Sequence, residues 1–403
     1  MIKPLRGMKD LTFEESQRFT YIIETAAVIA KRYGYHYIET PILEETVLFK
    51  RSVGDSSDIV SKEMYQFQDK GKNDVCMRPE GTAGVVRAFV SAKLDRQPVK
   101  QKFYYYGPMF RYERPQKGRL REFHQFGCES FGEGSVYEDF TVITMISQIF
   151  KALGIGFDLI INSLGCPSCM PPYRENLVRF LTEIRSDLCE DCNRRIGSNP
   201  IRVLDCKNET CQSLLSGSPK LIENLCNDCN SDFTILTKLL DNAGIAYKID
   251  THLVRGLDYY TKSAFEFVSD AIGSQSAIAG GGRYDKLVEY LDGKPTPAVG
   301  FAIGIERIME LVQMPEISRE GYYMGAMVPE ALEILFTLAA QKRLETKVTV
   351  EYIQKGFKSH MKGADKAHAR YALLIGEDEL ENGTVWIKDL ETKDERTLLL
   401  SNV

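Results

Sequence analysis

The feature that most constrains the fold is a cationic turn between two strand-like runs, at residues 103–129. The run Phe103-Tyr104-Tyr105-Tyr106 is typical of a strand, and we expect Gly107-Pro108 to close it. Five cations lie within residues 111–121, where Pro115 and Gly118 force a turn. A strand, a turn and a returning strand predict an antiparallel hairpin.

The tip of this hairpin has the chemistry of a phosphate site. The planar fork of an arginine side chain binds phosphate oxygens in pairs. On the returning strand Gln125, Gly127 and Glu129 alternate, so they share one face. A solvated charged hairpin is the simpler interpretation. A polar face beside aromatic residues instead favours the floor of a binding site.

Other segments predict helices and strands in no regular order. Apolar residues recur at helical spacing from Glu14 to Tyr33, and a second helical pattern spans residues 136–153. Strand candidates lie at residues 35–40, ending before Pro41, and at residues 264–268. Because strands and helices do not alternate as βαβ units, we expect an α+β fold with an antiparallel sheet.

Length and composition restrict the class of protein. The 403 residues suffice for two or three domains, and 43% hydrophobic with 27% charged residues is ordinary for a globular chain. The formal charge of −5 means that nucleic-acid binding would need local basic patches. The chain has neither a long apolar run nor the apolar core of a signal peptide, so we expect a cytoplasmic protein without membrane segments.

Eight of the ten cysteines lie in residues 166–229, as four close pairs. Thiols stay reduced in the cytosol, so ten cysteines are too many to interpret as disulfides. The spacings fit thiolate pairs that grip tetrahedral zinc, and eight ligands suffice for two structural sites. Reduced thiols without metal are the alternative. The pairs are Cys166 with Cys169, Cys189 with Cys192, Cys206 with Cys211, and Cys226 with Cys229.

Several segments, in the same order, resemble the class II aminoacyl-tRNA synthetases in the form typical of histidyl-tRNA synthetases. Residues 34–41, 110–129 and 300–307 resemble motifs 1, 2 and 3 of the class. Arg78-Pro79-Glu80-Gly81-Thr82 resembles the loop for the substrate amino group, and residues 253–261 and 279–285 resemble two histidine-specific signatures. The match runs from Arg6 to about residue 315. Each motif alone is weak, but together they are highly specific.

The resemblance implies an ATP-dependent, AMP-forming histidine–tRNA ligase. Such an enzyme activates L-histidine with ATP to histidyl-adenylate plus pyrophosphate, then transfers histidine to the 3′ end of its tRNA. Attack of a carboxylate on the α-phosphorus builds charge on phosphate oxygens, so the chemistry needs fixed cations. The resemblance makes Arg255 and Arg111 the catalytic residues, Arg255 bridging the carboxylate and the α-phosphate. ATP with magnesium would bind Arg111, Arg119, Arg307 and Glu113.

The resemblance also implies a histidine pocket. Glu80, Thr82 and Gln125 would hold the α-amino group, and Arg255 the carboxylate. Glu129 with Tyr260 would satisfy both nitrogens of the imidazole, and a substrate without these nitrogens would leave buried polar groups unpaired. Tyr259 and Tyr284 would line the same pocket, although core packing is the simpler role for a tyrosine.

The chain is expected to divide at these motifs. Residues 1–164 and 249–322 would form the catalytic core, interrupted by a cysteine-rich insertion at residues 165–248. Residues 323–403, with strand candidates at 348–350, 371–375 and 385–387, would form a small α/β anticodon-binding domain. Motif 1 implies a homodimer, because this motif pairs across a two-fold axis in the class.

A stripe of cations marks the last domain. Five cations and one aspartate between Lys355 and Arg370 give this stretch a formal charge of +4 inside an acidic chain. Such a stripe alone is usually a solvated face. At the end of a synthetase it predicts a phosphate-binding patch for histidine tRNA, at Lys355, Lys358, Lys362 and Lys366.

Two other functions compete with the ligase. The regulatory subunit of ATP phosphoribosyltransferase keeps the class II core, but it usually lacks the C-terminal domain and parts of the catalytic signatures. Arg111, Arg255 and Arg307 are all present here. A zinc-dependent nucleic-acid-binding protein would explain the cysteines, but it would leave the pocket residues without a purpose.

Overall fold

A computed structural model describes residues 2–54, 57–116, 118–204, 206, 208–253, 257, 259–273, 277–316 and 318–403. The chain forms two compact units, which divide between Met314 and Pro315. In the described part of the chain, no helix is long and apolar enough to cross a membrane.

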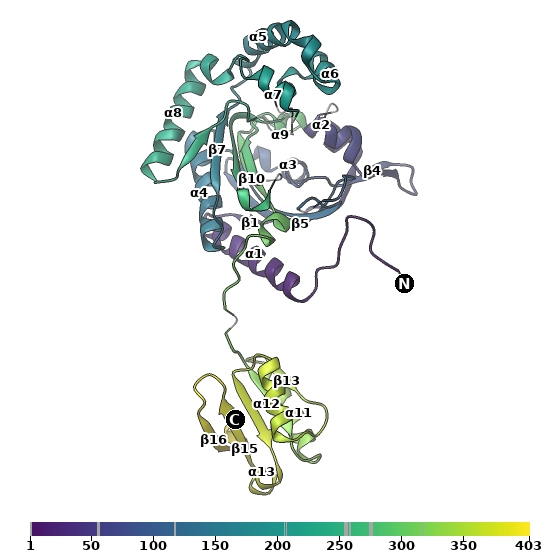
Figure 1. The fold of residues 1–403 in the computed structure, drawn as a ribbon, viewed down its shortest axis with the longest axis vertical. Helices are drawn as coiled ribbons and strands as arrows, with labels where there is room; N and C mark the ends of the chain where they lie inside the picture. The colour runs from purple at the N-terminus through teal and green to yellow at the C-terminus, as the bar shows by residue number, and fades with distance from the viewer. Residues whose placement is uncertain are drawn as a thin grey trace. The chain divides into compact units, whose positions relative to one another are not determined.

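The first unit is built on an eight-stranded sheet (Figure 1). Its order is β1-β5-β6-β11-β10-β9-β7-β8, and neighbours are antiparallel except β1 with β5 and β7 with β8. The expected α+β fold with an antiparallel sheet is confirmed. The strands are β1 (His36–Tyr37), β5 (Gln101–Phe110), β6 (Glu122–Phe131), β7 (Asp158–Ser163), β8 (Tyr247–Ile249), β9 (Thr261–Val268), β10 (Ala277–Arg283) and β11 (Ala298–Gly304).

Different helices cover the two faces of this sheet. On one face α1 (Phe13–Arg32), α4 (Val136–Ala152), α8 (Asn227–Asn242) and α10 (Ile305–Met309) share a core with Tyr104 and Phe126. On the other face α3 (Thr82–Ser91) and α9 (Leu287–Tyr290) share a core with Tyr105. Because strand side chains alternate, Gln125, Gly127 and Glu129 lie on the same face as Tyr105, as expected.

The hairpin is longer than predicted, whereas the first strand is shorter. β5 does not close at Gly107-Pro108 but runs on to Phe110, with Pro108 opposite His124 of β6. Proline fits there because β1 pairs only with Phe103 and Tyr104, so β5 is an edge strand at Pro108. The strand expected at residues 35–40 is reduced to His36–Tyr37. Both predicted helices are confirmed to within one residue.

A small three-stranded sheet leads the chain to the loop before α3. Its order is β2-β4-β3, with α2 (Thr46–Val53) following β2. Arg78, directly after β4, is buried and donates to the carbonyl oxygens of Thr40 at 2.8 Å and Pro108 at 2.9 Å. These bonds anchor the loop against the end of β5. The strands are β2 (Leu43–Glu45), β3 (Gln66–Gln68) and β4 (Asp74–Met77).

A helical insertion separates β7 from β8. It contains α5 (Met170–Glu183), α6 (Glu190–Ser198) and α7 (Glu209–Leu215), and α8 returns the chain to the sheet. The insertion has a core of its own, in which Tyr173, Leu177 and Leu181 pack with cysteines.

The second unit is a five-stranded sheet with helices. Its order is β13-β12-β14-β15-β16, in which β12 is parallel to β13 and β14 and the remaining pairs are antiparallel. The three strands predicted here are confirmed, as is the small α/β unit. The elements are β12 (Tyr322–Ala326), α11 (Ala331–Lys342), β13 (Val348–Val350), α12 (Phe357–Lys366), β14 (Tyr371–Ile375), α13 (Glu377–Asn382), β15 (Thr384–Asp389) and β16 (Glu395–Leu399).

Candidate active site and metal centres

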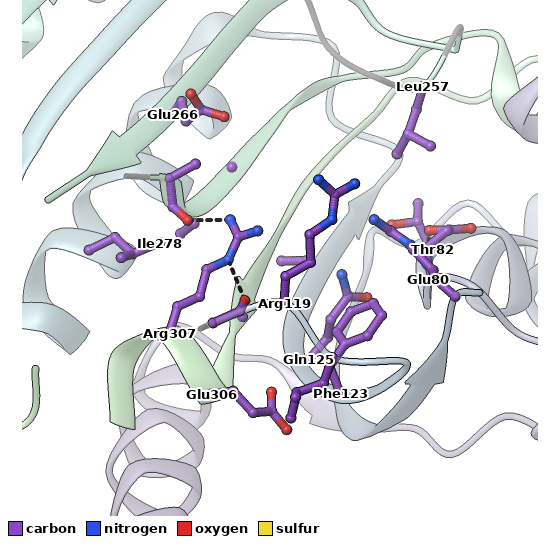
Figure 2. A pocket seen from close by; sticks show the side chains of 18 of the residues that line it. Glu80, Thr82, Arg119, Phe123, Gln125, Leu257, Glu266, Ile278, Glu306 and Arg307 are labelled. Carbon is purple, nitrogen blue, oxygen red and sulfur yellow. Dashed lines mark hydrogen bonds between the residues drawn. The ribbon is translucent and has the colours of Figure 1, made fainter. Parts of the chain in front are cut away.

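A cavity of about 280 Å³ opens on the face of the large sheet beside the hairpin turn (Figure 2). Its floor is a row of mostly small residues. Ala302 of β11 lies opposite Gly280 of β10, which lies opposite Glu266 of β9, and all three line the cavity. The short side chains of β10 and β11 leave room above the sheet, so the sequence of these two strands creates the space for a ligand.

Gly281 and Gly282, which follow Gly280 in β10, have a packing role. A Cβ on Gly281 would collide with the carbonyl oxygen of Gly300 and the ring of Phe265. Gly282 has a φ of +157°, and a Cβ there would meet the carbonyl oxygen of Ser263. Of the three, Gly280 lines the cavity, so close approach of backbone to a ligand is expected only there.

Three arginines converge on the cavity. Arg111 donates through Nε to the carbonyl oxygen of Pro79 at 2.9 Å, and its guanidinium lies 5.1 Å from the ring centre of Phe123. Burial lowers its pKa. Arg307 donates to the carbonyl oxygens of Gly118 at 3.2 Å and Ala277 at 2.5 Å (Figure 2).

Arg119 comes from the hairpin turn and lies between Arg307 and Glu80 in the view of Figure 2. It forms an ion pair with Glu113, and its Nη2 is 3.7 Å from Glu63. The predicted ATP residues Arg111, Glu113, Arg119 and Arg307 therefore line one cavity. Fixed guanidinium groups of this kind suit an anionic ligand.

Two predicted amino-group residues lie at the start of α3, on the opposite wall. The buried carboxylate of Glu80 accepts the backbone N–H groups of Thr82 at 2.7 Å and Ala83 at 2.9 Å. Burial is the main cause that raises the pKa of Glu80. Gln125 and Tyr259 also line the cavity, and each has a buried oxygen without a hydrogen-bond partner among the described residues. Such atoms are available to a ligand.

Glu129 lies beneath this wall and is completely buried. Its carboxylate accepts hydrogen bonds from the hydroxyls of Thr82 at 2.7 Å, Tyr105 at 3.2 Å and Tyr284. Burial raises the pKa of Glu129 to about 8, although the hydroxyls of Tyr284 and Thr82 oppose the shift. A Cβ on Gly300 would overlap the Glu129 carboxylate, so glycine is required opposite it.

The three predicted tyrosines lie at different depths. Tyr259 and Tyr260 line the cavity. Tyr284 does not line the cavity; it packs below, edge-on to Tyr259, and binds Glu129. The sequence could not reveal this because the interacting residues are far apart in the chain.

Sequence analysis missed several residues around the cavity. Tyr105 binds Glu129, Phe123 supports Arg111, and Glu266 lines the cavity. Glu306 also lines it and accepts from the backbone N–H of His124 at 2.9 Å. A signal for Tyr105 existed: it lies in the same strand face as the predicted floor, directly opposite Gly127.

Arg255, the residue with the most specific predicted role, lies outside the described residues, as do Val254, Gly256 and Asp258. Leu257, within the same signature, lines the cavity.

The eight paired cysteines form two clusters of four. The neck cluster is Cys166, Cys169, Cys226 and Cys229; the distal cluster is Cys189, Cys192, Cys206 and Cys211. In each cluster all Sγ atoms lie within 4.8 Å of one another, with Sγ–Sγ distances of 3.7 Å between Cys166 and Cys226 and 3.8 Å between Cys189 and Cys206. Four sulfurs about 2.3 Å from a tetrahedral zinc would be about 3.8 Å apart.

Each cluster has one cysteine whose pKa is lowered, Cys166 or Cys189, whereas burial raises the pKa of Cys169, Cys192, Cys211 and Cys229. Backbone N–H groups donate to sulfur, from Cys226 to Cys169 at 3.2 Å and from Cys189 to Cys211 at 3.3 Å. Burial opposes ionisation of Cys166, but the N–H groups of Ser168 and Cys169 lower its pKa to about 6. The thiolate is the form that binds metal.

The predicted basic stripe is shorter in the structure. Lys358, Lys362 and Lys366 are exposed on α12 and follow one helical face. Lys355 precedes the helix and forms an ion pair with Glu351 at 2.7 Å, so its charge is offset. Lys355 therefore differs from the three exposed lysines of α12, because Glu351, four residues earlier in the chain, is its ion-pair partner.

Comparisons with known proteins agree along the chain. A sequence profile described as Histidyl-tRNA synthetase matches residues 7–168 and 209–308, and one described as Anticodon binding domain matches residues 326–403. The chain is 82% identical over 403 residues to the histidine–tRNA ligase of Sulfurovum sp. strain NBC37-1, covering 100% of both. It is 63% identical to that of Sulfurimonas denitrificans, covering 99% of each. A crystal structure of apo S. aureus histidyl-tRNA synthetase has a TM-score of 0.83 and 33% identity, covering 100% of this chain and 98% of that chain.

Proposed function

Because the chain belongs to the histidyl-tRNA synthetase family, we propose that it activates L-histidine with ATP and transfers it to the 3′ end of histidine tRNA. The observation that carries the proposal is one cavity with two chemistries. Arginines line one part, and Glu80 and Thr82 at the start of α3 line another, with Glu129 buried beneath them. A triphosphate and an amino acid have matching charges and hydrogen-bonding groups.

Activation requires two anions to approach each other. Arg111, held by Pro79 and Phe123, is proposed to bind the α-phosphate. Arg255 would bridge that phosphate and the histidine carboxylate, while Arg307 and Arg119 hold the rest of the triphosphate. Preorganised cations stabilise the charge that develops on the phosphate oxygens without reorganising during the reaction.

Magnesium would accompany ATP. Carboxylate oxygens of Glu266 and Glu306 border the same cavity, and oxygen is the ligand that magnesium prefers. When bound, the ion neutralises phosphate charge.

Histidine recognition is proposed to use the other wall. Glu80, Thr82 and Gln125 would bind the α-amino group, for which the unpartnered buried oxygen of Gln125 is an acceptor. Glu129, backed by Tyr284, would accept from the imidazole, with Tyr259 and Tyr260 around the ring. An amino acid without the imidazole N–H would leave these groups unpaired, so rejection needs no second site.

ATP–pyrophosphate exchange with each of the twenty amino acids tests the proposal. We expect exchange with histidine alone. Exchange stimulated by another amino acid would contradict the assignment, and exchange with none would favour a non-catalytic relative such as the regulatory subunit considered above.

We further propose that each cysteine cluster binds one structural zinc ion in the reducing cytoplasm. The matching Sγ–Sγ distances and the N–H groups aimed at sulfur support this role. Elemental analysis of protein prepared without chelator should give two zinc ions per chain. Protein that contains no zinc would refute the proposal.

The second unit and the edge of the large sheet suggest two partners. The anticodon-binding profile and the exposed Lys358, Lys362 and Lys366 support binding of histidine tRNA.

The edge strand β1 exposes Tyr37 beside Tyr106, at 45% and 38% of their surfaces, which suits pairing in a homodimer. Light scattering should give the mass of a dimer; an active monomer of 45.7 kDa would contradict it.

A further inference from the structure

The two cysteine clusters occupy different places relative to the cavity. Cys166 lies three residues after β7 ends, and Cys226 is the residue before α8 begins. The neck cluster therefore ties the chain entering the insertion to the chain leaving it. The distal cluster joins the start of α6 to α7, within the insertion.

Lys262, at the start of β9, is held by residues on both sides of the neck cluster. Its N–H donates to the carbonyl oxygen of Gly165 at 2.7 Å, and its carbonyl oxygen accepts from Leu164 at 2.5 Å. Its Nζ lies 3.0 Å from a carboxylate oxygen of Asp232, on the first turns of α8. One anchor directly precedes Cys166, and the other lies three residues beyond Cys229.

The backbone of Lys262 needs such anchors. Its φ is +52°, in the left-handed region that side chains other than glycine adopt at a cost of ~1–3 kcal/mol. The surrounding hydrogen bonds must hold this conformation. Without them, Lys262 would relax toward an ordinary strand conformation and change the direction of the chain beside it.

That neighbouring chain is the wall of the cavity. Tyr260, two residues before Lys262, lines the cavity, and its ring centre lies 4.7 Å from that of Tyr259. Leu253 is also held: its carbonyl oxygen accepts from Asn162 of β7 at 3.0 Å. A shift at Lys262 would thus displace Tyr260.

We infer that the neck cluster, when it binds its metal, positions Lys262 and through it Tyr260. The helices that carry distal cysteines contact other parts of the unit: Leu215 of α7 contacts His252 at 3.4 Å, and Arg195 of α6 contacts Asp58 at 3.3 Å. The inference rests on the zinc binding and histidine activation proposed above. Among the described residues, no hydrogen bond from a distal cysteine reaches residues 259–262. The two metals would therefore differ in their effect on histidine.

Two matched variants test this difference. Cys226 and Cys189 are each the N-cap of a helix and the first cysteine of a pair. Serine is a good N-cap, so Cys226→Ser and Cys189→Ser both keep the helix start. Each should lower zinc from two ions to one per chain. Cys226→Ser should raise the KM for histidine in pyrophosphate exchange about tenfold, and Cys189→Ser less than about twofold. The KM for ATP should change less than that for histidine.

A double-mutant cycle with Lys262→Gly identifies the path. Glycine adopts a positive φ without strain, so the anchors should matter less in its presence. Cys226→Ser and Lys262→Gly should be non-additive in their effects on the KM for histidine, whereas Cys189→Ser and Lys262→Gly should be additive. Additivity in both cycles, or equal effects of the two serine variants, would overturn the inference.

The zinc content and exchange activity of the unmodified protein distinguish failure of the zinc proposal from failure of the ligase proposal. Absence of zinc would overturn the metal proposal and this inference, and absence of exchange would overturn the ligase. If Cys226→Ser does not fold, Asp232→Asn serves instead, because it weakens the Lys262 anchor while keeping all eight cysteines. It should raise the KM for histidine about threefold with two zinc ions retained; an unchanged KM would overturn the inference.

Discussion

Glu129→Gln should impair histidine activation, because the NH₂ group of glutamine would face hydroxyl groups that donate hydrogen bonds to Glu129. Three hydroxyls, from Thr82, Tyr105 and Tyr284, donate to the two carboxylate oxygens of Glu129. Glutamine has nearly the same shape, but it replaces one acceptor oxygen by an NH₂ donor. At least one hydroxyl then loses its acceptor, and the imidazole loses a carboxylate.

The magnitude follows from those losses. A buried imidazole N–H left without its acceptor costs ~1–3 kcal/mol, which corresponds to roughly 5- to 150-fold in kcat/KM for histidine. Tyr105→Phe is the control, because it removes one hydroxyl from below the cavity and should cost no more than about tenfold. Pyrophosphate exchange at varied histidine measures both. If Glu129→Gln changed kcat/KM for histidine less than threefold, or raised the KM for ATP equally, Glu129 would not contact the imidazole.

The same carboxyl predicts a pH dependence of stability. The pKa of Glu129 rises from an ordinary 4.5 to about 8 in the folded protein, mainly through burial. The folded state therefore holds a proton that the unfolded state releases, and this stabilisation is complete below pH 4.5 and lost as pH rises to about 8. The loss approaches ~1.4 kcal/mol per pH unit. Glu129→Gln has no such titrating group. In urea unfolding of the ligand-free proteins, the free energy of unfolding of the variant should therefore rise relative to that of the parent between pH 5 and pH 8. A constant difference would refute the assigned shift.

Three further predictions concern other parts of the chain. Alanine at all three exposed lysines of α12, Lys358, Lys362 and Lys366, should weaken tRNA binding and flatten its salt dependence while sparing pyrophosphate exchange; equal loss of exchange would contradict a separate tRNA-binding unit. Arg255→Ala should slow adenylate formation roughly a hundredfold in single-turnover measurements and slow transfer from preformed adenylate less; equal effects would indicate a general structural role. Asp139→Asn should destabilise the protein by ~1.5–3 kcal/mol in urea unfolding, because it removes the buried carboxylate from Arg283 and leaves Asp285, at 3.2 Å, as its ion-pair partner; a loss below about 0.5 kcal/mol would be inconsistent with a contribution from the Asp139 pair.

The sequence by itself determined the local structure and the chemistry of the site. The period of apolar residues predicted α1 and α4, and the alternation of Gln125, Gly127 and Glu129 predicted their common face. Both signals depend only on neighbours along the chain, since helix and strand periods are local properties. The cationic turn between β5 and β6 likewise predicted where arginine side chains gather, since Arg111 and Arg119 line one cavity.

Tertiary structure alone decided which distant groups meet. Glu129 binds hydroxyls from residues 47 and 155 positions away, and no local pattern selects Thr82 and Tyr284 over other hydroxyls. The first cysteine pair joins the fourth, not the second, because β7 and α8 bring the two ends of the insertion together. Such contacts follow from the order of strands and the packing of helices, which bring together residues that spacing along the chain cannot pair.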